Sequence, residues 1–194
     1  MRPMSRRDAV LAVLLCAAAV SGCGGGETSD PGDNDAQTSN AHTSITVTST
    51  AFADGGTIPV RFTCDGDETS PPLAWTGAGG AAGAPAAWAL VVDDPDAPGD
   101  TFVHWVVLDI PPATRTVAEG AVPAGATEVT NSAGSASYAG PCPPSGTHHY
   151  RFTVYALPAP TGLTDSAGLD DALAKVRSSA DAQGTLVGLY TRGS

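Results

Sequence analysis

The sequence predicts a mostly β protein, an antiparallel two-sheet β-sandwich with one or two short helices. Residues 102–109 and 150–157 each alternate between two sets of side chains, and both sets are rich in apolar residues. An alternation of period two is typical of a β-strand, and apolar residues in both sets indicate a strand that is buried on both faces. Turn-rich segments separate these runs, whereas a parallel sheet would need regular crossover helices.

Shorter apolar runs predict further strands at residues 45–48, 87–92, 128–131 and 186–190. One helix is expected from about residue 169 to residue 180, because apolar side chains recur there at helical spacing, namely Leu169, Leu173 and Val176. Acidic residues in its first turn and basic residues in its last turn complement the helix dipole. We expect this helix to cover an edge or an end of a sheet.

The first residues of the chain are expected to lie outside this fold. Three arginines, Arg2, Arg6 and Arg7, precede an apolar run at residues 9–20. This run is shorter than the roughly 20 residues that a membrane-spanning helix needs. The pattern therefore predicts an export signal peptide at residues 1–22.

Val20-Ser21-Gly22-Cys23 resembles the lipobox of bacterial lipoproteins, in which cleavage before the cysteine leaves a first residue that carries lipid. We therefore expect Cys23 to be the lipidation site that anchors the protein in the bacterial cell envelope. Residues 23–43 contain no aliphatic side chain larger than alanine, and they predict a flexible stalk. Residues 44–194 are then expected to form one domain.

The charge of the chain limits its partners. Without residues 1–22 the protein keeps 6 basic and 19 acidic residues, a net charge of −13. Such an acidic surface repels polyanions, and the few scattered cations do not build a basic face, so nucleic acid is not expected as a partner. Acidity also weakens attraction to anionic lipid, so membrane attachment is expected to depend on the Cys23 lipid alone.

Two cysteines remain for the folded domain. Cys16 lies in the predicted signal peptide and Cys23 is the predicted anchor, which leaves Cys64 and Cys142. Disulfides persist in exported proteins, so we predict a Cys64–Cys142 disulfide. Two free buried thiols are the alternative, because a sequence does not show whether two Cα atoms come close enough to be bridged.

Two short stretches concentrate the polar chemistry of the chain. Residues 93–98 read Asp-Asp-Pro-Asp-Ala-Pro and lead into Phe102-Val103-His104-Trp105. Residues 140–146 read Gly-Pro-Cys-Pro-Pro-Ser-Gly and lead into His148-His149-Tyr150. Each stretch places acidic, imidazole or backbone N–H groups beside a rigid proline turn and then enters an apolar strand. We expect them to form two walls of one pocket at a sheet edge.

Strand alternation predicts where the histidines of this pocket point. His104 should share a strand face with Phe102 and Val106, and His148 should share one with Tyr150. Each stretch would then aim one imidazole toward the same hollow.

The aspartates of the first stretch are held by a turn. Asp94 and Asp96 flank Pro95, whose fixed φ keeps both carboxylates where they can accept backbone N–H groups or orient an imidazole. We expect one of them to hold His104 in a donor form. Affinity for an anion should then fall as the imidazoles lose their protons.

Three other chemistries fit this set of residues less well. Two histidines and a carboxylate can ligate zinc or iron, but the H-x-E, H-x-x-x-H and C-x-x-C spacings are absent from the sequence. Nucleophilic catalysis by Ser145 or Cys142 would need an adjacent imidazole base, and a G-x-S-x-G turn is absent as well. Residues 77–82 match G-x-G-x-x-A only because the segment is nearly all glycine and alanine.

A pocket for a small anion uses every unusual residue of the two stretches. The prolines at positions 141, 143 and 144 have no N–H. The backbone donors that remain free in the loop are therefore N–H groups such as those of Cys142 and Gly146. These donors can point at a phosphate or carboxylate beside His104 and His148. We predict no metal, no cofactor and no catalytic residue.

At these residues the chain resembles the phosphatidylethanolamine-binding protein family, in the bacterial branch usually labelled Raf kinase inhibitor-like. The resemblance covers most of residues 45–192, and it also includes Thr-Cys-Asp-Gly at 63–66 and Ser-Pro-Pro-Leu-Ala-Trp at 70–75. It implies a β-sandwich with one cavity for phosphate, phosphorylethanolamine-like head groups or other small anions. By position it implies a set of ligand-binding residues, namely Asp94, Asp96, His104, Gly140, Cys142, Pro144, His148 and Tyr150.

One departure from the family pattern affects charge. His149 stands where an arginine is common, so the rim of the cavity lacks a permanent positive charge at this position. The kinase-inhibitor label is not expected to describe a role, because an exported protein does not meet a cytoplasmic kinase.

The function that we favour from sequence is a lipid-anchored protein that binds or senses a small anionic ligand. One alternative is an inhibitor or partner-binding module for a secreted protease or an envelope protein, acting through an exposed loop such as residues 77–85. A hydrolase that depends on His148 is the other alternative.

Overall fold

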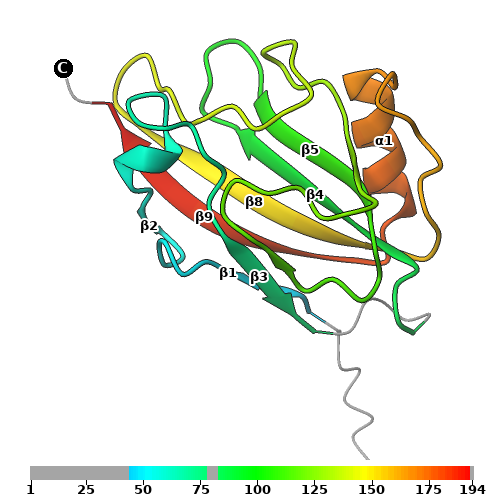
Figure 1. Cartoon of the computed structure of the whole chain (residues 1–194). Coiled ribbons are helices and arrows are strands. Elements are labelled where there is room, and N and C mark those ends of the chain that lie inside the picture. Colours follow the sequence, from blue (N-terminus) through cyan, green and yellow to red (C-terminus); the bar gives the residue numbers. More distant parts are fainter. Residues whose placement is uncertain (1–43, 78–82, 193–194) are drawn as a thin grey trace, which may run out of the picture. The chain divides into compact units, whose positions relative to one another are not determined.

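The computed structural model describes residues 44–77 and 83–192, which form two β-sheets and one α-helix (Figure 1). The larger sheet has the strand order β2-β9-β8-β4-β5-β7, and the smaller sheet has the order β1-β3-β6. Strand pairs are antiparallel, except that β2 runs parallel to β9. The elements are β1 (Thr46–Thr48), β2 (Gly56–Thr57), a 3₁₀ helix (Val60–Phe62), β3 (Leu73–Thr76), β4 (Ala87–Asp94), β5 (Phe102–Ile110), β6 (Thr116–Val117), β7 (Thr127–Glu128), β8 (Thr147–Leu157), α1 (Leu169–Ser179) and β9 (Ala182–Thr191).

The main core lies between the two sheets. Trp75 of β3 packs there with alternate side chains of the larger sheet, including Phe152 and Val154 of β8. The opposite face of the larger sheet forms a second core with α1, where Val91 of β4 lies in the same cluster as Val176. Strand β4 is therefore buried on both faces, which explains its continuous apolar run.

The predicted fold class is confirmed, and so are most of the predicted elements. Strands β1, β4, β5, β8 and β9 lie at the predicted positions, and α1 ends one residue before the predicted end. The strand predicted at residues 128–131 is wrong beyond Glu128, because β7 ends there. Strand β3, the middle strand of the smaller sheet, was not expected.

A β-bulge in β5 changes the direction of His104. Val92 pairs with Trp105 and Asp93 pairs with Val103, so His104 is an extra residue without a partner in β4. The prediction that His104 shares a face with Val106 is therefore wrong, since Val106 packs in the core beside α1. The ring of Phe102 does lie next to His104, with 4.8 Å between the ring centroids.

The predicted signal peptide at residues 1–22, the lipidation site Cys23 and the stalk at residues 23–43 lie outside the described residues and stay predictions. The same holds for most of the glycine- and alanine-rich segment, residues 78–82. Within the described part of the chain, no helix combines the length and apolar character that a membrane span requires.

Candidate functional site

Three strand ends meet at one end of the larger sheet. Strand β4 ends at Asp94, β5 begins at Phe102, and β8, the other neighbour of β4, begins at Thr147. The ends enclose a cavity of about 310 Å³ together with two loops. Its lining residues are Cys64, Glu68, Asp94, Ala97, Pro98, Phe102, His104, Ala133, Ala139, Gly140, Cys142, Pro144 and His148. Both predicted walls therefore contribute to one cavity.

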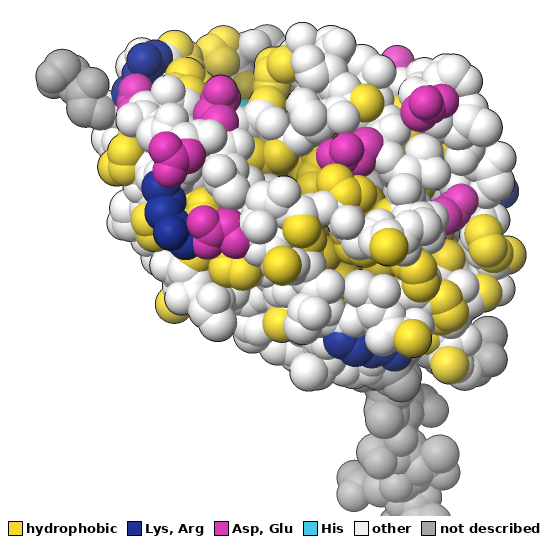
Figure 2. Space-filling model, in the orientation of Figure 1, with side chains coloured by type: hydrophobic (Ala, Val, Ile, Leu, Met, Phe, Trp, Pro, Cys, Tyr) yellow, Lys and Arg dark blue, Asp and Glu magenta, His cyan; other side chains and the backbone are white. Residues whose placement is uncertain are grey.

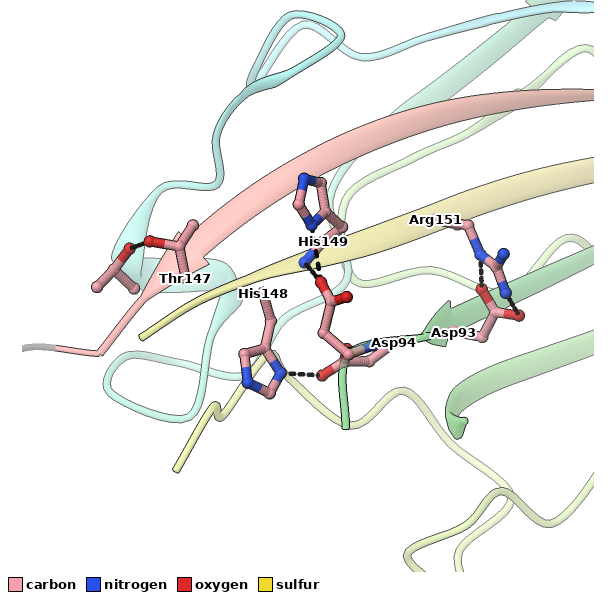
Figure 3. Close-up of polar contacts among 8 residues, drawn as sticks. Asp93, Asp94, Thr147, His148, His149 and Arg151 are labelled. Atoms are coloured by element: carbon pink, nitrogen blue, oxygen red, sulfur yellow. Dashed lines mark hydrogen bonds and ion pairs between the residues drawn. The ribbon is translucent and has the colours of Figure 1, made fainter. Parts of the chain in front are cut away.

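Asp94 and His148 form a buried pair in the wall of this cavity. Asp94 Oδ2 lies 2.7 Å from His148 Nδ1, and the two side chains are only 5% and 9% exposed (Figure 3). The other carboxylate oxygen of Asp94 accepts the backbone N–H of Asp96 at 2.8 Å, which closes the proline turn. The carboxylate thus places a proton on His148 Nδ1 and leaves Nε2 as the second polar atom of this ring.

His104 is oriented by a backbone carbonyl. Its Nδ1 lies 2.8 Å from the carbonyl oxygen of Ala139, so Nδ1 carries the proton and donates it. Nε2 is buried and has no hydrogen-bond partner among the described residues. Burial lowers the pKa of His104 below its usual 6.5, in spite of the Ala139 carbonyl and the Asp94 charge, which both raise it. The expectation that Asp94 or Asp96 orients His104 is wrong.

Tyr150 stands between the two histidines. Its ring centroid lies 5.3 Å from that of His104 and 6.4 Å from that of His148. The side chain is fully buried, and its hydroxyl lacks a hydrogen-bond partner within residues 44–77 and 83–192. Burial, followed by the negative charge of Asp94, raises the pKa of Tyr150 well above its usual value, so the hydroxyl keeps its proton. Tyr150 is not among the residues that line the cavity.

Asp96 lies outside the cavity and binds a different histidine. Its Oδ2 accepts the backbone N–H of His149 at 2.8 Å and lies 2.7 Å from His149 Nδ1. Both side chains are exposed, and the hydrogen bonds from His149 lower the pKa of Asp96. His149 points to the opposite side of β8 from His148 (Figure 3), which follows from strand alternation.

The second wall is fastened by a disulfide. Cys64 and Cys142 are bonded, with 5.4 Å between their Cα atoms, which confirms the predicted pairing. Next to this bond the Cys64 N–H donates to the Pro141 carbonyl at 3.1 Å. Gly140 allows this close approach, because a Cβ at this position would lie 2.8 Å from Thr63 C and 2.9 Å from Cys64 N. Gly146, one of the predicted donors, does not line the cavity.

Two residues of the site were not singled out from sequence. Glu68 lines the cavity and accepts the Gly140 N–H at 3.3 Å, and its φ of 51° is in the left-handed region that non-glycine residues seldom adopt. Asn131 is buried and donates from Nδ2 to the carbonyls of His104 and Ser137 at 3.0 and 2.8 Å. Isolated polar residues in turn-rich segments carry no pattern that would have marked them.

The charged side chains around the cavity do not attract an anion strongly. Among its lining residues in the described chain there is no lysine or arginine, and the carboxylates of Glu68 and Asp94 contribute negative charge. Acidic side chains are spread across the surface drawn in Figure 2, where basic side chains occupy few places. In the described residues no group of three or more His, Cys, Asp or Glu side chains is arranged to hold a metal ion. The chemistry of the site therefore depends on hydrogen bonding.

The fold and the site together define the protein as a two-sheet β-sandwich with a histidine- and aspartate-lined cavity at the end of its larger sheet. The family model for phosphatidylethanolamine-binding protein matches residues 48–191. The chain belongs to this family, as the motifs in the sequence predicted.

Two relatives match most of this chain. Mycobacterium tuberculosis LppC, a predicted lipoprotein, is 42% identical over 199 residues, which cover 96% of this chain and 97% of the relative. A UPF0098 protein from Methanothermobacter thermautotrophicus is 43% identical over 148 residues, covering 74% of this chain and 96% of its own.

Two solved structures share the fold. A phosphatidylethanolamine-binding protein homologue from Chlamydia trachomatis has a TM-score of 0.71 and 30% identity, and it covers 78% of this chain and 99% of its own. Escherichia coli YbcL, a member of the same family, has a TM-score of 0.72 and 28% identity, and it covers 77% of this chain and 99% of its own. The sandwich is therefore the common part of these proteins.

Proposed function

We propose that this protein is exported, anchored to the cell envelope through lipid on Cys23, and binds a small phosphate-bearing ligand in the cavity between β4, β5 and β8. The observation that carries the proposal is His104, whose Nε2 is buried in the cavity wall without a partner among the described residues. A buried polar atom without a hydrogen bond costs about 1–3 kcal/mol, which a bound ligand can recover.

The size and lining of the cavity support a head group or a free phosphoester over a whole lipid. A volume of about 310 Å³ is near the lower end of the range for small-molecule sites. Phe102, Pro98 and Ala97 provide an apolar side next to the polar atoms of His104 and His148. The name of the family supports a phosphorylethanolamine-like ligand, and the predicted lipoprotein among the relatives supports the anchor.

Calorimetric titration of the purified full chain with phosphorylethanolamine and with inorganic phosphate tests this proposal. We expect saturable binding at about pH 6, and we expect His104→Ala to abolish the heat. His149→Ala is the matched control, because His149 is exposed and bonded to Asp96 outside the cavity. If the wild-type protein bound neither compound, the proposed function would be rejected.

The two alternatives from sequence stay predictions with their own tests. Release of phosphate from a phosphoester that is lost in His148→Ala would support a hydrolase. A stable complex with a secreted or envelope protein that is lost when residues 77–85 are shortened would support a partner-binding module.

A further inference from the structure

We infer that the cavity selects an oxyanion that still carries a proton, a hydrogen phosphate or hydrogen phosphonate monoanion, and rejects equally charged oxyanions that have no proton to donate. This inference rests on the proposed function and specifies the form of ligand that the same site takes. It follows from which hydrogen-bonding groups of the cavity are left open.

The open group of the cavity is an acceptor. Because His104 Nδ1 donates to the Ala139 carbonyl, the neutral ring presents the lone pair of Nε2, which can only accept a hydrogen bond. His104 is 4% exposed, so water does not readily supply the missing donor. The ligand must therefore bring a proton to this atom, or the ring must take up a second proton inside a buried wall.

The groups that face His104 determine whether its ring stays neutral or takes up a second proton. Asp94 and Asp93 of β4 favour a charged ring, whereas His148 of β8 and burial oppose it, and burial is the largest influence on the pKa. Tyr150 of β8 keeps its proton and adds no charge. From the loop wall Glu68 adds a second carboxylate to the cavity. The site therefore favours the neutral ring more than water does.

This acceptor sets the requirement for the ligand. Tyr150 does not line the cavity, so its hydroxyl is not counted among the groups that a ligand can reach. A P–OH group can donate a hydrogen bond to His104 Nε2, whereas a sulfonate offers only acceptors. The dianion of a phosphoester or phosphonate has no P–OH, so it would also leave His104 Nε2 without a donor, and it would face the carboxylates of Asp94 and Glu68.

Methylphosphonate and methanesulfonate test this selection on the full-length protein. At about pH 6 methylphosphonate is mainly the hydrogen monoanion, because the second pKa of a phosphonate lies above the value of about 6 for phosphate esters. It then has a shape similar to that of methanesulfonate and the same single charge, and the two compounds differ by one proton. Calorimetry should give a dissociation constant for methylphosphonate at least about tenfold lower than that for methanesulfonate, since a site built around a hydrogen bond discriminates against an analogue that lacks it. Equal affinities would overturn the inference and leave the proposed function standing, whereas binding of neither compound, together with no binding of inorganic phosphate, would overturn both.

A variant and a spectroscopic measurement add independent readouts. His104→Gln places an amide that can donate as well as accept, so the discrimination against methanesulfonate should shrink, and the control His149→Gln should retain it. Nitrogen NMR of the free wild-type protein at the same pH should find His104 neutral, with its proton on Nδ1. A cationic His104 ring, or discrimination that is unchanged in His104→Gln, would contradict the inference.

Discussion

Removal of the Cys64–Cys142 disulfide should lower the stability of the domain by several kcal/mol. The two cysteines are 78 positions apart in sequence. In the chain-entropy model, closing a loop of this length removes about 15 cal/mol/K from the unfolded chain, or about 4.5 kcal/mol at 25 °C. Each kcal/mol shifts Tm by about 2–4 °C in a domain of this size. The double variant Cys64→Ala/Cys142→Ala should therefore unfold about 9–18 °C below the oxidised wild type.

Urea unfolding followed by tryptophan fluorescence measures this loss directly. The three tryptophans, Trp75, Trp88 and Trp105, are buried in the core between the sheets, so their emission reports unfolding of the sandwich. The wild type should be compared in oxidising and reducing buffer, and the double variant in both. We expect the reduced wild type and the double variant to have the same free energy of unfolding. The reductant should not change the stability of the double variant.

A loss of less than about 1 kcal/mol in the double variant would refute this reasoning. It would mean that the unfolded chain is already compact enough for the loop closure to cost little entropy. The folded state should tolerate the change, because other bonds join the same walls. Tyr138 Oη donates to the Phe62 carbonyl at 3.0 Å, and Cys64 N–H donates to the Pro141 carbonyl at 3.1 Å.

Two further predictions concern the same cavity. Gly140→Ala should destabilise the domain by about 1–3 kcal/mol, because its Cβ would press on backbone atoms of Thr63 and Cys64, and an unchanged urea midpoint would contradict this. Burial holds the pKa of His104 below 6.5. As the pH decreases below 6.5, the unfolded chain therefore binds a proton that the folded protein excludes, and the free energy of unfolding should decrease. His104→Gln should make this decrease smaller, as measured by urea unfolding between about pH 6.5 and 5, whereas the control His149→Gln should leave it unchanged. If the free energy of unfolding depended on pH to the same extent in both variants, that result would contradict the buried neutral ring.

The long strands were predictable because each carries enough residues to show a period of two. Strand β8 has 11 residues and β5 has 9, whereas β2, β6 and β7 have 2 each and show no period at all. Strand β3 has only 4 residues after two prolines, so its place at the centre of the smaller sheet depends on pairing with distant strands. A strand can be predicted from alternation only when it is long enough to show the period of two.

The error at residues 128–131 has a different cause. Val129 still donates its N–H to the Val106 carbonyl. Beyond this residue, hydrogen bonds to the side chain of Asn131 replace the backbone pairing of the strand. Its Oδ1 accepts the N–H groups of Ala133 and Ser135 at 2.9 and 3.1 Å and turns the chain toward the cavity. Alternation along a sequence does not distinguish a strand from a turn that a side chain closes.

The gathering of the motifs at one cavity followed from the sequence, but the choice of partners did not. Asp94 binds His148, Asp96 binds His149, and His104 is left to the Ala139 carbonyl. The bulge that inserts His104 into β5 adds one residue, and no hydrophobic pattern marks it.

This choice of partners decides the chemistry of the cavity. A carboxylate on Nδ1 of His104 would have favoured the imidazolium, because opposite charges in a buried site attract strongly. A carbonyl fixes the same tautomer with a weaker pull on the proton, so burial prevails and the pKa falls. In the binding that we propose, the ring would then act as an acceptor that requires a proton from its ligand, and no longer as a donor that attracts any anion. The selection that we infer for the oxyanion would thus follow from a bulge of one residue in β5.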